Sequence, residues 1–377
     1  MAVARSRVTA KKQILPDPFA KRLQALRDTL RQRETDAALI TGPHDQFYLT
    51  GFTGEDGAVM VTRKTVWLIT DGRFKEQARR EAPGAKVLIR KVGLAQAVGQ
   101  LAGRLRIGRI LVQPEVMTLD MAAGLRKHLP QSARLIRAGG VIRKMRSTKD
   151  PVEIDRIRAA IRVGEEAFEV LRRRIRPGMT ESQVAALLEY EMRRRGASGP
   201  AFATIAAVDA NAALPHYRAG GVRVPGNGLL LVDWGARLDG YCGDLTRVLL
   251  IGRIPARIKR LYQAVLDAQQ AAIAAIRPGI PCRQVDRTAR RVLDRAGLGR
   301  YFVHGVGHGL GLEVHESPRL AATSTGCLEP GMVVTVEPGV YLPDEAGIRI
   351  EDDVVVTETG CEVLSRLPKH LEWAMIR

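Results

Sequence analysis

Residues 229–250 read LLLVDWGARLDGYCGDLTRVLL, and this stretch decides the fold of the second half of the chain. Two apolar runs flank the polar segment 237–240, which is the pattern of a β-hairpin. Asp233 lies in the first run and Asp244 begins the second. A four-residue turn over 237–240 would place these two carboxylates directly opposite each other on one face of the sheet. An acid in such a run is costly to bury unless its charge is compensated, so the pair predicts a cation between them.

A second pair of acids follows the same arrangement further along the chain. The strand-like segments VVTVEPG (333–339) and IRIE (348–351) flank a turn at 342–346. A loop centred on Asp344 would place Glu337 opposite Glu351. One such acid alone would be interpreted as a hydrogen-bonded structural residue. Two separate hairpins with facing carboxylates favour a metal site instead.

Between the two hairpins lies the Gly-rich segment FVHGVGHGLGLEVHESP (302–318). It contains three of the seven histidines of the chain, namely His304, His308 and His315. A single histidine would more often be a satisfied core residue, but three in a loop that lets backbone approach a ligand closely predict a site. The glycine spacing matches neither a phosphate-binding loop nor a dinucleotide fingerprint.

Four carboxylates and one imidazole make an oxygen-rich ligand set without thiols: Asp233, Asp244, His308, Glu337 and Glu351. Such a set suits Mn, Co, Fe or Zn better than it suits a structural zinc site built from cysteines, and we expect Mn first. Two divalent ions would balance the four negative charges and activate a water as a nucleophile. Hydrolysis is therefore the expected class of reaction.

The pattern of elements predicts two domains, residues 1–144 and 145–377. In the first, strands at 37–40, 65–70, 86–89 and 109–112 alternate with helices, which is typical of an α/β domain. The polar, Pro-marked segment 145–151 follows, with Ser147 or Thr148 as the candidate cap of the next helix. Helices at 151–175 and 180–195 and then a series of strands predict an α+β second domain.

Composition narrows the classes of protein. The chain has 377 residues, 45% of them hydrophobic and 26% charged, which is typical of a folded globular protein of two domains. No apolar run reaches the roughly 18 residues of a membrane span, and no apolar stretch follows the basic segment 1–13, so neither a membrane partner nor a secretory signal is expected. Four scattered cysteines predict reduced thiols and a cytoplasmic protein.

The net charge of +19 could indicate nucleic-acid binding. However, Lys and Arg occur along the whole chain, and no nucleic-acid recognition motif is present. We therefore do not expect nucleic acid as a partner. A basic, non-catalytic binding module on the same fold is the alternative from another functional class.

Taken together, these motifs resemble those of the pita-bread metallopeptidases, which include aminopeptidase P, prolidase and methionine aminopeptidase. The segments DWG(x)8D, HGxGHG, VEPG and RIED occur in the order of that family within residues 145–377. Residues 1–144 resemble the creatinase-like N-terminal domain of the family. Methionine aminopeptidases usually lack this domain, so the proline-directed branch is the better match.

The resemblance implies a role for each metal-site residue. Asp233 would bind one ion, Asp244 and Glu351 would bridge the two ions, and His308 and Glu337 would complete their coordination. The carboxylate of Glu337 would also accept the proton of the attacking water. These assignments follow from the resemblance and not from spacing alone.

The resemblance also implies the residues that meet the substrate. His315 would stabilise the oxyanion, His304 would line the proline subsite, and His216 would lie near the scissile peptide. Tyr341 and Arg349 would form a relay behind Asp233. Two further positions stand apart from these. Arg319 occupies a position where some prolidases hold the substrate carboxylate, although related aminopeptidases can carry Arg there too. Tyr217 replaces a Gly that is common at this position in the family, and it could narrow the subsite.

The function that this resemblance implies is that of an Xaa-Pro aminopeptidase, whose peptide substrate has proline in the second position. An Xaa-Pro dipeptidase is the alternative. The family also implies a homodimer, in which the N-terminal domain of one subunit lies beside the active site of its partner.

Overall fold

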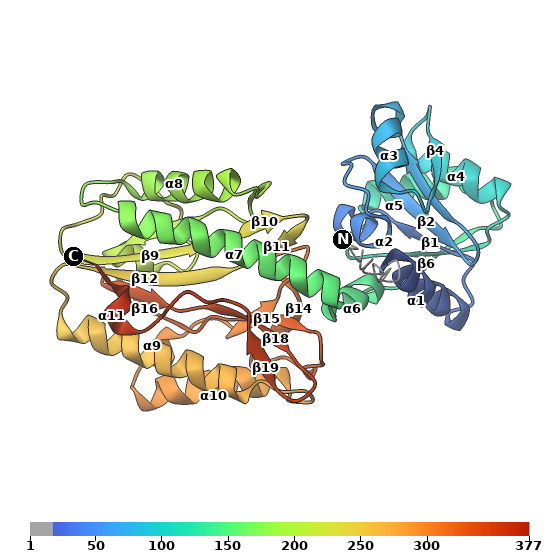
Figure 1. Cartoon of the computed structure of the whole chain (residues 1–377). Coiled ribbons are helices and arrows are strands. Elements are labelled where there is room, and N and C mark those ends of the chain that lie inside the picture. The colour runs from blue at the N-terminus through green and yellow to red at the C-terminus, as the bar shows by residue number, and fades with distance from the viewer. Residues whose placement is uncertain (1–17, 377) are drawn as a thin grey trace, which may run out of the picture. The chain divides into compact units, whose positions relative to one another are not determined.

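A computed structural model describes residues 18–376, which form two compact units divided after Met145 (Figure 1). The basic segment 1–13 lies outside the described residues. No helix within 18–376 is long and apolar enough to cross a membrane.

The first unit is built on a six-stranded sheet in the order β4-β3-β2-β1-β5-β6. Only β2 runs antiparallel to the other five strands. The strands are β1 (Ala37–Ile40), β2 (Gly57–Thr62), β3 (Val66–Thr70), β4 (Lys86–Ile89), β5 (Arg109–Val112) and β6 (Arg134–Arg137). The helices are α1 (Pro18–Gln32), α2 (Pro43–Thr50), α3 (Lys75–Glu81), α4 (Leu94–Arg104), α5 (Leu119–His128) and α6 (Val141–Ser147). All four residues of β1 are buried, as expected for a sheet covered on both faces, and the α/β class is confirmed.

The second unit is an α+β domain, as expected. Its long helices α7 (Pro151–Arg174) and α8 (Glu181–Arg194) lie on one side of the central strands, and α9 (Ala256–Ala275) and α10 (Cys282–Arg295) lie on the other (Figure 1). The strands are β7 (Gly199–Pro200), β8 (Ile205–Val208), β9 (Gly228–Trp234), β10 (Ala236–Leu238), β11 (Tyr241–Cys242), β12 (Leu245–Ile251), β13 (Gly307–Gly309), β14 (Glu316–Leu320), β15 (Val333–Val336), β16 (Gly339–Leu342), β17 (Ala346–Arg349), β18 (Asp352–Val356), β19 (Cys361–Val363) and β20 (Met375–Ile376). One buried apolar cluster joins β9 and β12 to α9, α10 and β15–β18.

The first long helix of this unit, α7, begins at Pro151 as expected, but its N-cap is neither of the expected residues. Asp150 is the N-cap: its carboxylate accepts a 2.9 Å hydrogen bond from the backbone N–H of Glu153, and the Glu153 side chain accepts one from the N–H of Asp150 at 3.1 Å. The candidates Ser147 and Thr148 were wrong, because α6 continues through Ser147 and Thr148 forms an isolated bridge with Met332.

The first metal-site hairpin has a different register from the expected one. Leu238 pairs with Tyr241 and Asp233 pairs with Thr246, so Asp233 is not directly opposite Asp244. The reason is a two-residue turn: Asp239 and Gly240 both adopt positive φ, at 48° and 85°, which closes the hairpin more tightly than a four-residue turn. Asp233 and Asp244 remain on the same face, offset diagonally.

The second hairpin has the expected register. Val336 pairs with Asp352 and Gly339 pairs with Arg349, which places Glu337 across from Glu351 in the gap between the two paired regions. Asp344, with a φ of 57°, lies at the centre of the three-residue loop. Strand pairing is interrupted at both glutamates, so Glu337 and Glu351 lie in the gap between the two paired regions.

Candidate metal centre and active site

The carboxylates of the two hairpins meet the imidazole of His308 inside the second unit. Its Nε2 atom lies 3.3 Å from Oε1 of Glu337 and 3.8 Å from Oδ2 of Asp244. One ligand atom each from Asp244, His308 and Glu351 lie within 4.8 Å of one another. Asp233 is close enough for its charge to raise the pKa of both Asp244 and Glu351. The structure thus brings all five expected ligands together.

The site concentrates negative charge where water is scarce. Burial, followed by the charges of neighbouring acids, raises the pKa of Asp244 and of Glu351 well above the ordinary values. Burial also raises the pKa of Asp233, although the Arg349 guanidinium opposes this. Burial opposes ionisation of Glu337 as well, but its hydrogen bond with His308 and the nearby positive charges hold its pKa at about 2.

These residues fit divalent cations. Oδ1 of Asp233 is buried and accepts no hydrogen bond from any residue in 18–376, so it is available to bind a cation. Divalent cations would offset the burial and the mutual repulsion that raise the pKa values of Asp244 and Glu351. The donor set contains oxygen and imidazole nitrogen and no sulfur, as hard and borderline metals prefer.

A network of hydrogen bonds orients two of the acids. Arg349 donates to Oδ2 of Asp233 at 2.6 Å, to the Tyr341 hydroxyl at 2.7 Å and to the Thr246 hydroxyl at 3.1 Å. Thr246 in turn donates to Oε2 of Glu351 at 2.6 Å. The expected relay of Tyr341 and Arg349 behind Asp233 is therefore present as geometry, and Thr246 extends it to a second acid.

The remaining histidines lie around this centre. Nε2 of His304 is 2.8 Å from the hydroxyl of Tyr341. The ring of His315 is 4.3 Å from that of His308, edge to face, and its side chain is exposed. His216 lies on an exposed loop after the short helix 209–213, and its charge contributes, after burial, to lowering the pKa of both His304 and His315.

Arg319 lies on β14, where it pairs in register with His308. Its side chain is exposed and makes no hydrogen bond or ion pair with any residue of the described range. It is close enough to His315 for its charge to lower the pKa of that histidine, after the larger effects of burial and of His308.

Tyr217 anchors the loop that carries His216. Its hydroxyl donates to Oε2 of Glu181 at 2.8 Å and accepts from Nδ2 of Asn211 at 2.9 Å. Glu181 is fully buried and also accepts hydrogen bonds from the backbone N–H groups of Val208 and Gly220. The aromatic ring packs against the core cluster. From the sequence, Tyr217 was expected to narrow the subsite. Its buried partner, Glu181, was not identified from the sequence.

Arg247 is another supporting residue that sequence reasoning missed. It is fully buried and donates to the backbone carbonyl of Glu351, to Oδ1 of Asp352 at 2.8 Å and to the carbonyls of Leu367 and Pro368 at 2.8 and 3.2 Å. An arginine within the buried strand β12 was the signal that could have found it, because such a charge needs partners.

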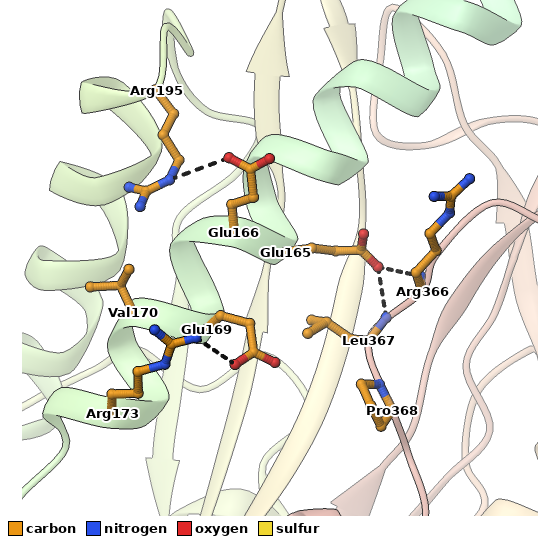
Figure 2. Close-up of a pocket in the computed structure, with 9 residues that line it drawn as sticks. All are labelled: Glu165, Glu166, Glu169, Val170, Arg173, Arg195, Arg366, Leu367 and Pro368. Carbon is orange, nitrogen blue, oxygen red and sulfur yellow. Dashed lines mark hydrogen bonds and ion pairs between the residues drawn. The ribbon is translucent and has the colours of Figure 1, made fainter.

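Glu165 contacts the same segment through its backbone at residues 366–367 (Figure 2). Oε1 of Glu165 accepts hydrogen bonds from the backbone N–H groups of Arg366 and Leu367, the second at 2.9 Å. These residues line a surface pocket of about 460 Å³ that contains none of the predicted site residues. The pocket is therefore not the candidate active site.

The chain belongs to metallopeptidase family M24. A family model described as "Metallopeptidase family M24" matches residues 155–358, and one described as "Creatinase/Prolidase N-terminal domain" matches residues 22–148. The pita-bread class expected from the motifs is thereby confirmed, and the protein is a metallo-exopeptidase.

Individual relatives are similar over nearly the whole chain. The peptidase YqhT of Bacillus subtilis is 36% identical over 350 residues, which cover 93% of this chain and 99% of the relative. A solved Xaa-Pro dipeptidase from Bacillus anthracis is 35% identical, with a TM-score of 0.90 and coverage of 94% and 99%. An X-Pro aminopeptidase from Thermotoga maritima is 36% identical, with a TM-score of 0.86 and coverage of 91% and 99%.

Proposed function

We propose that this protein hydrolyses the peptide bond between an N-terminal residue and a following proline, with two divalent metal ions as cofactors. The convergence of Asp233, Asp244, His308, Glu337 and Glu351 on one buried site carries this proposal. Divalent ions, when bound, supply Lewis acidity and lower the pKa of water so that it can attack a peptide carbonyl. Manganese is the proposed metal, with Co, Zn or Fe as alternatives.

The proton acceptor in this proposal is Glu337. Its pKa of about 2 keeps the carboxylate ionised at neutral pH, and His308 holds one of its oxygens in place. An ionised, positioned carboxylate can accept the proton of an attacking water. Arg349 and Tyr341 would keep Asp233 oriented, as residues behind metal ligands commonly do.

The histidines supply the proposed substrate contacts. His315 is exposed beside His308, so a substrate at the centre can reach its ring, and we assign it to the oxyanion. His304, hydrogen-bonded to Tyr341, would line the proline subsite, and His216 would approach the scissile peptide from its loop.

The preferred length of substrate is the finer part of the proposal. His315 and Arg319 are both exposed, which leaves room beyond the centre for residues that follow proline. This supports the Xaa-Pro aminopeptidase as the first candidate. One observation favours the Xaa-Pro dipeptidase as the second: the unpaired guanidinium of Arg319 near His315 is suited to hold the free carboxylate of a dipeptide.

A single assay separates these functions. Purified protein is stripped with chelator, reloaded with Mn, and supplied with Xaa-Pro or with Xaa-Pro-Xaa-Xaa. We expect cleavage after the first residue of the longer peptide, only after metal is restored. Cleavage of the dipeptide alone would assign the dipeptidase instead. No cleavage of either with Mn, Co or Zn would refute the Xaa-Pro proposal and favour a non-catalytic binding module.

Assembly and location complete the proposal. We propose a homodimer, the commonest symmetric oligomer, in a cytoplasmic setting. A mass measurement in solution at micromolar concentration tests the dimer. A fully active monomer would refute the idea that a partner subunit helps to close the substrate pocket.

A further inference from the structure

The positive charge of the chain is concentrated in its first unit. Residues 1–145 contain 27 Lys and Arg against 12 Asp and Glu, whereas residues 146–377 contain 32 against 28. The first unit therefore carries +15 of the net charge of +19. The observation that Lys and Arg occur along the whole chain did not reveal this imbalance between the two units.

Within the first unit, cations line the edge of the sheet where β1, β3, β4, β5 and β6 begin and β2 ends. Six exposed residues at strand ends or turns of this edge form what we call the cationic edge: Arg63, Lys64, Lys86, Arg106, Arg109 and Arg134. Arg109 and Arg134 are direct register partners in β5 and β6. Because the row runs from β4 to β6, it is about 25 Å long at the usual spacing of strands.

The cationic edge is not neutralised. None of its six residues forms an ion pair with a carboxylate within 18–376, and Arg63 and Arg134 instead donate to backbone carbonyls. Two acids, Glu34 and Asp36, also lie at this edge, so its six cations outnumber its acids; the carboxylate of Asp36 accepts hydrogen bonds from the backbone N–H groups of Gly108 and Arg109. The ion pairs of the sheet gather at its opposite end, around Asp56 and Asp71.

Helix stabilisation does not account for this row. Arg104, Arg126 and Lys127 lie in the last turns of α4 and α5, where cations complement the helix dipole. The six residues of the cationic edge lie outside helices, so the dipole gives them no such role. Like charges side by side, as at Arg109 and Arg134, are unfavourable unless a partner is present.

We propose that the cationic edge binds the phosphodiester backbone of a nucleic acid. A row of exposed guanidinium and ammonium groups along one edge of the sheet matches a linear polyanion, and each phosphate contact releases counterions. Among the described residues of the first unit, the one large hydrophobic residue that is strongly exposed, Leu119, begins α5 at the other end of the sheet. The edge therefore offers nothing for insertion into a lipid surface. Backbone contacts of this kind carry no sequence preference.

The test uses the full chain and a fluorescein-labelled DNA oligonucleotide of about 20 nucleotides, single-stranded or duplex, in anisotropy titrations at several salt concentrations. The variant is Arg63→Glu/Arg109→Glu/Arg134→Glu. The matched control is Arg283→Glu/Arg287→Glu/Arg291→Glu, which reverses three exposed arginines in line on α10 of the second unit.

We expect wild type and the α10 control to bind both forms of DNA, with an affinity that falls steeply with salt. The edge variant should bind at least about tenfold more weakly, and its slope of log affinity against log salt should be smaller by about 2 to 3. Its cleavage of Xaa-Pro substrate should be unchanged, because no edge residue belongs to the proposed centre. If the triple variant does not fold, Arg109→Gln/Arg134→Gln replaces it and should reduce the slope by about 1 to 2.

Three outcomes would overturn the proposal. The first is no DNA binding by wild type at 50 mM salt, and the second is a loss of binding in the α10 control with none in the edge variant. The third is tighter binding, through the same edge, to vesicles containing anionic lipid than to DNA, which would make a membrane surface the partner.

Discussion

Arg349 holds one oxygen of Asp233 and leaves the other free. Its Nη2 donates to Oδ2 at 2.6 Å, whereas Oδ1 is buried and has no hydrogen-bond partner within the described range. A carboxylate fixed through one oxygen presents the other in a defined direction, as a metal ligand requires. The same guanidinium also contacts Tyr341 and Thr246, so it couples Asp233 to the rest of the centre.

Removing the hydroxyl of Tyr341 should loosen this orientation without disturbing the fold. In Tyr341→Phe the buried ring stays, but Arg349 and His304 each lose a partner. We expect metal affinity to fall by about 10- to 100-fold, as measured by competition with a chelator, with the melting temperature of the metal-free protein nearly unchanged. Wild-type metal affinity in this variant would contradict the orienting role.

Replacing Glu337 by Gln should abolish turnover while the fold survives. The amide keeps one oxygen as a possible ligand but cannot accept a proton at neutral pH, so we expect a loss of about 10²-fold or more in kcat. The matched control is Glu345→Gln. Glu345 lies in the loop after β16, and its carboxylate contacts Arg257 of α9. Asp244→Asn should in addition lower metal occupancy. Near-normal kcat in the Glu337→Gln protein would show that another group accepts the proton.

Stability of the metal-free protein should fall as pH rises from 5 to 8. The pKa values of Asp244 and Glu351 are raised mainly by burial, so the folded state binds more protons than the unfolded chain and loses stability with rising pH. His308 acts in the same direction: burial lowers its pKa, but Glu337 raises it overall above 6.5, so its contribution is complete below that pH and is lost as pH rises through the folded value.

Glu337 has the opposite sign but titrates outside this window, because its stabilisation is present above pH 4.5 and disappears only toward pH 2. Scanning fluorimetry in EDTA should show a lower melting temperature at pH 8 than at pH 5, by roughly 2–4 °C for each kcal/mol lost. Saturating Mn should reduce or reverse the trend. A metal-free melting temperature that rises over this range would contradict the raised pKa values of Asp244 and Glu351.

Tyr217→Phe should weaken the anchor of the His216 loop. The variant removes the donor to Glu181 and the partner of Asn211, a loss of about 1–3 kcal/mol for a buried, charged acceptor. We expect a lower melting temperature and a higher KM with a smaller change in kcat. Tyr190→Phe, at an exposed tyrosine on α8, is the control. If both variants had wild-type KM and stability, the loop would not depend on Tyr217.

Arg319→Gln tests whether Arg319 favours dipeptides over longer peptides. If the guanidinium holds the carboxylate of a dipeptide, KM for Xaa-Pro should rise by at least about tenfold, since a charged hydrogen bond is worth about 1.5–3 kcal/mol. KM for Xaa-Pro-Xaa-Xaa should not change. Equal effects on both peptides would mean that Arg319 does not read the carboxylate.

Local sequence determined several elements of this protein and indicated the residue types of its candidate site. The strands 37–40, 86–89 and 109–112 were predicted with their observed ends, and the helix expected from residue 180 is α8, whose N-cap Thr180 forms a capping box with Gln183. These features depend on residues a few positions apart. The register that sets Glu337 across from Glu351 also followed from the sequence, because a short loop centred on Asp344 determines it.

Tertiary structure alone decided the features that join distant segments. The register of Asp233 depended on Asp239 adopting positive φ, a choice between turn types that the residues permit but do not dictate. Arg247 meets the carbonyl of Glu351 across 104 positions. The cationic edge exists because strands from separate segments begin at the same side of one sheet. Buried charges and strand edges acquire their partners only through packing. Their roles therefore cannot be predicted from any one stretch of sequence.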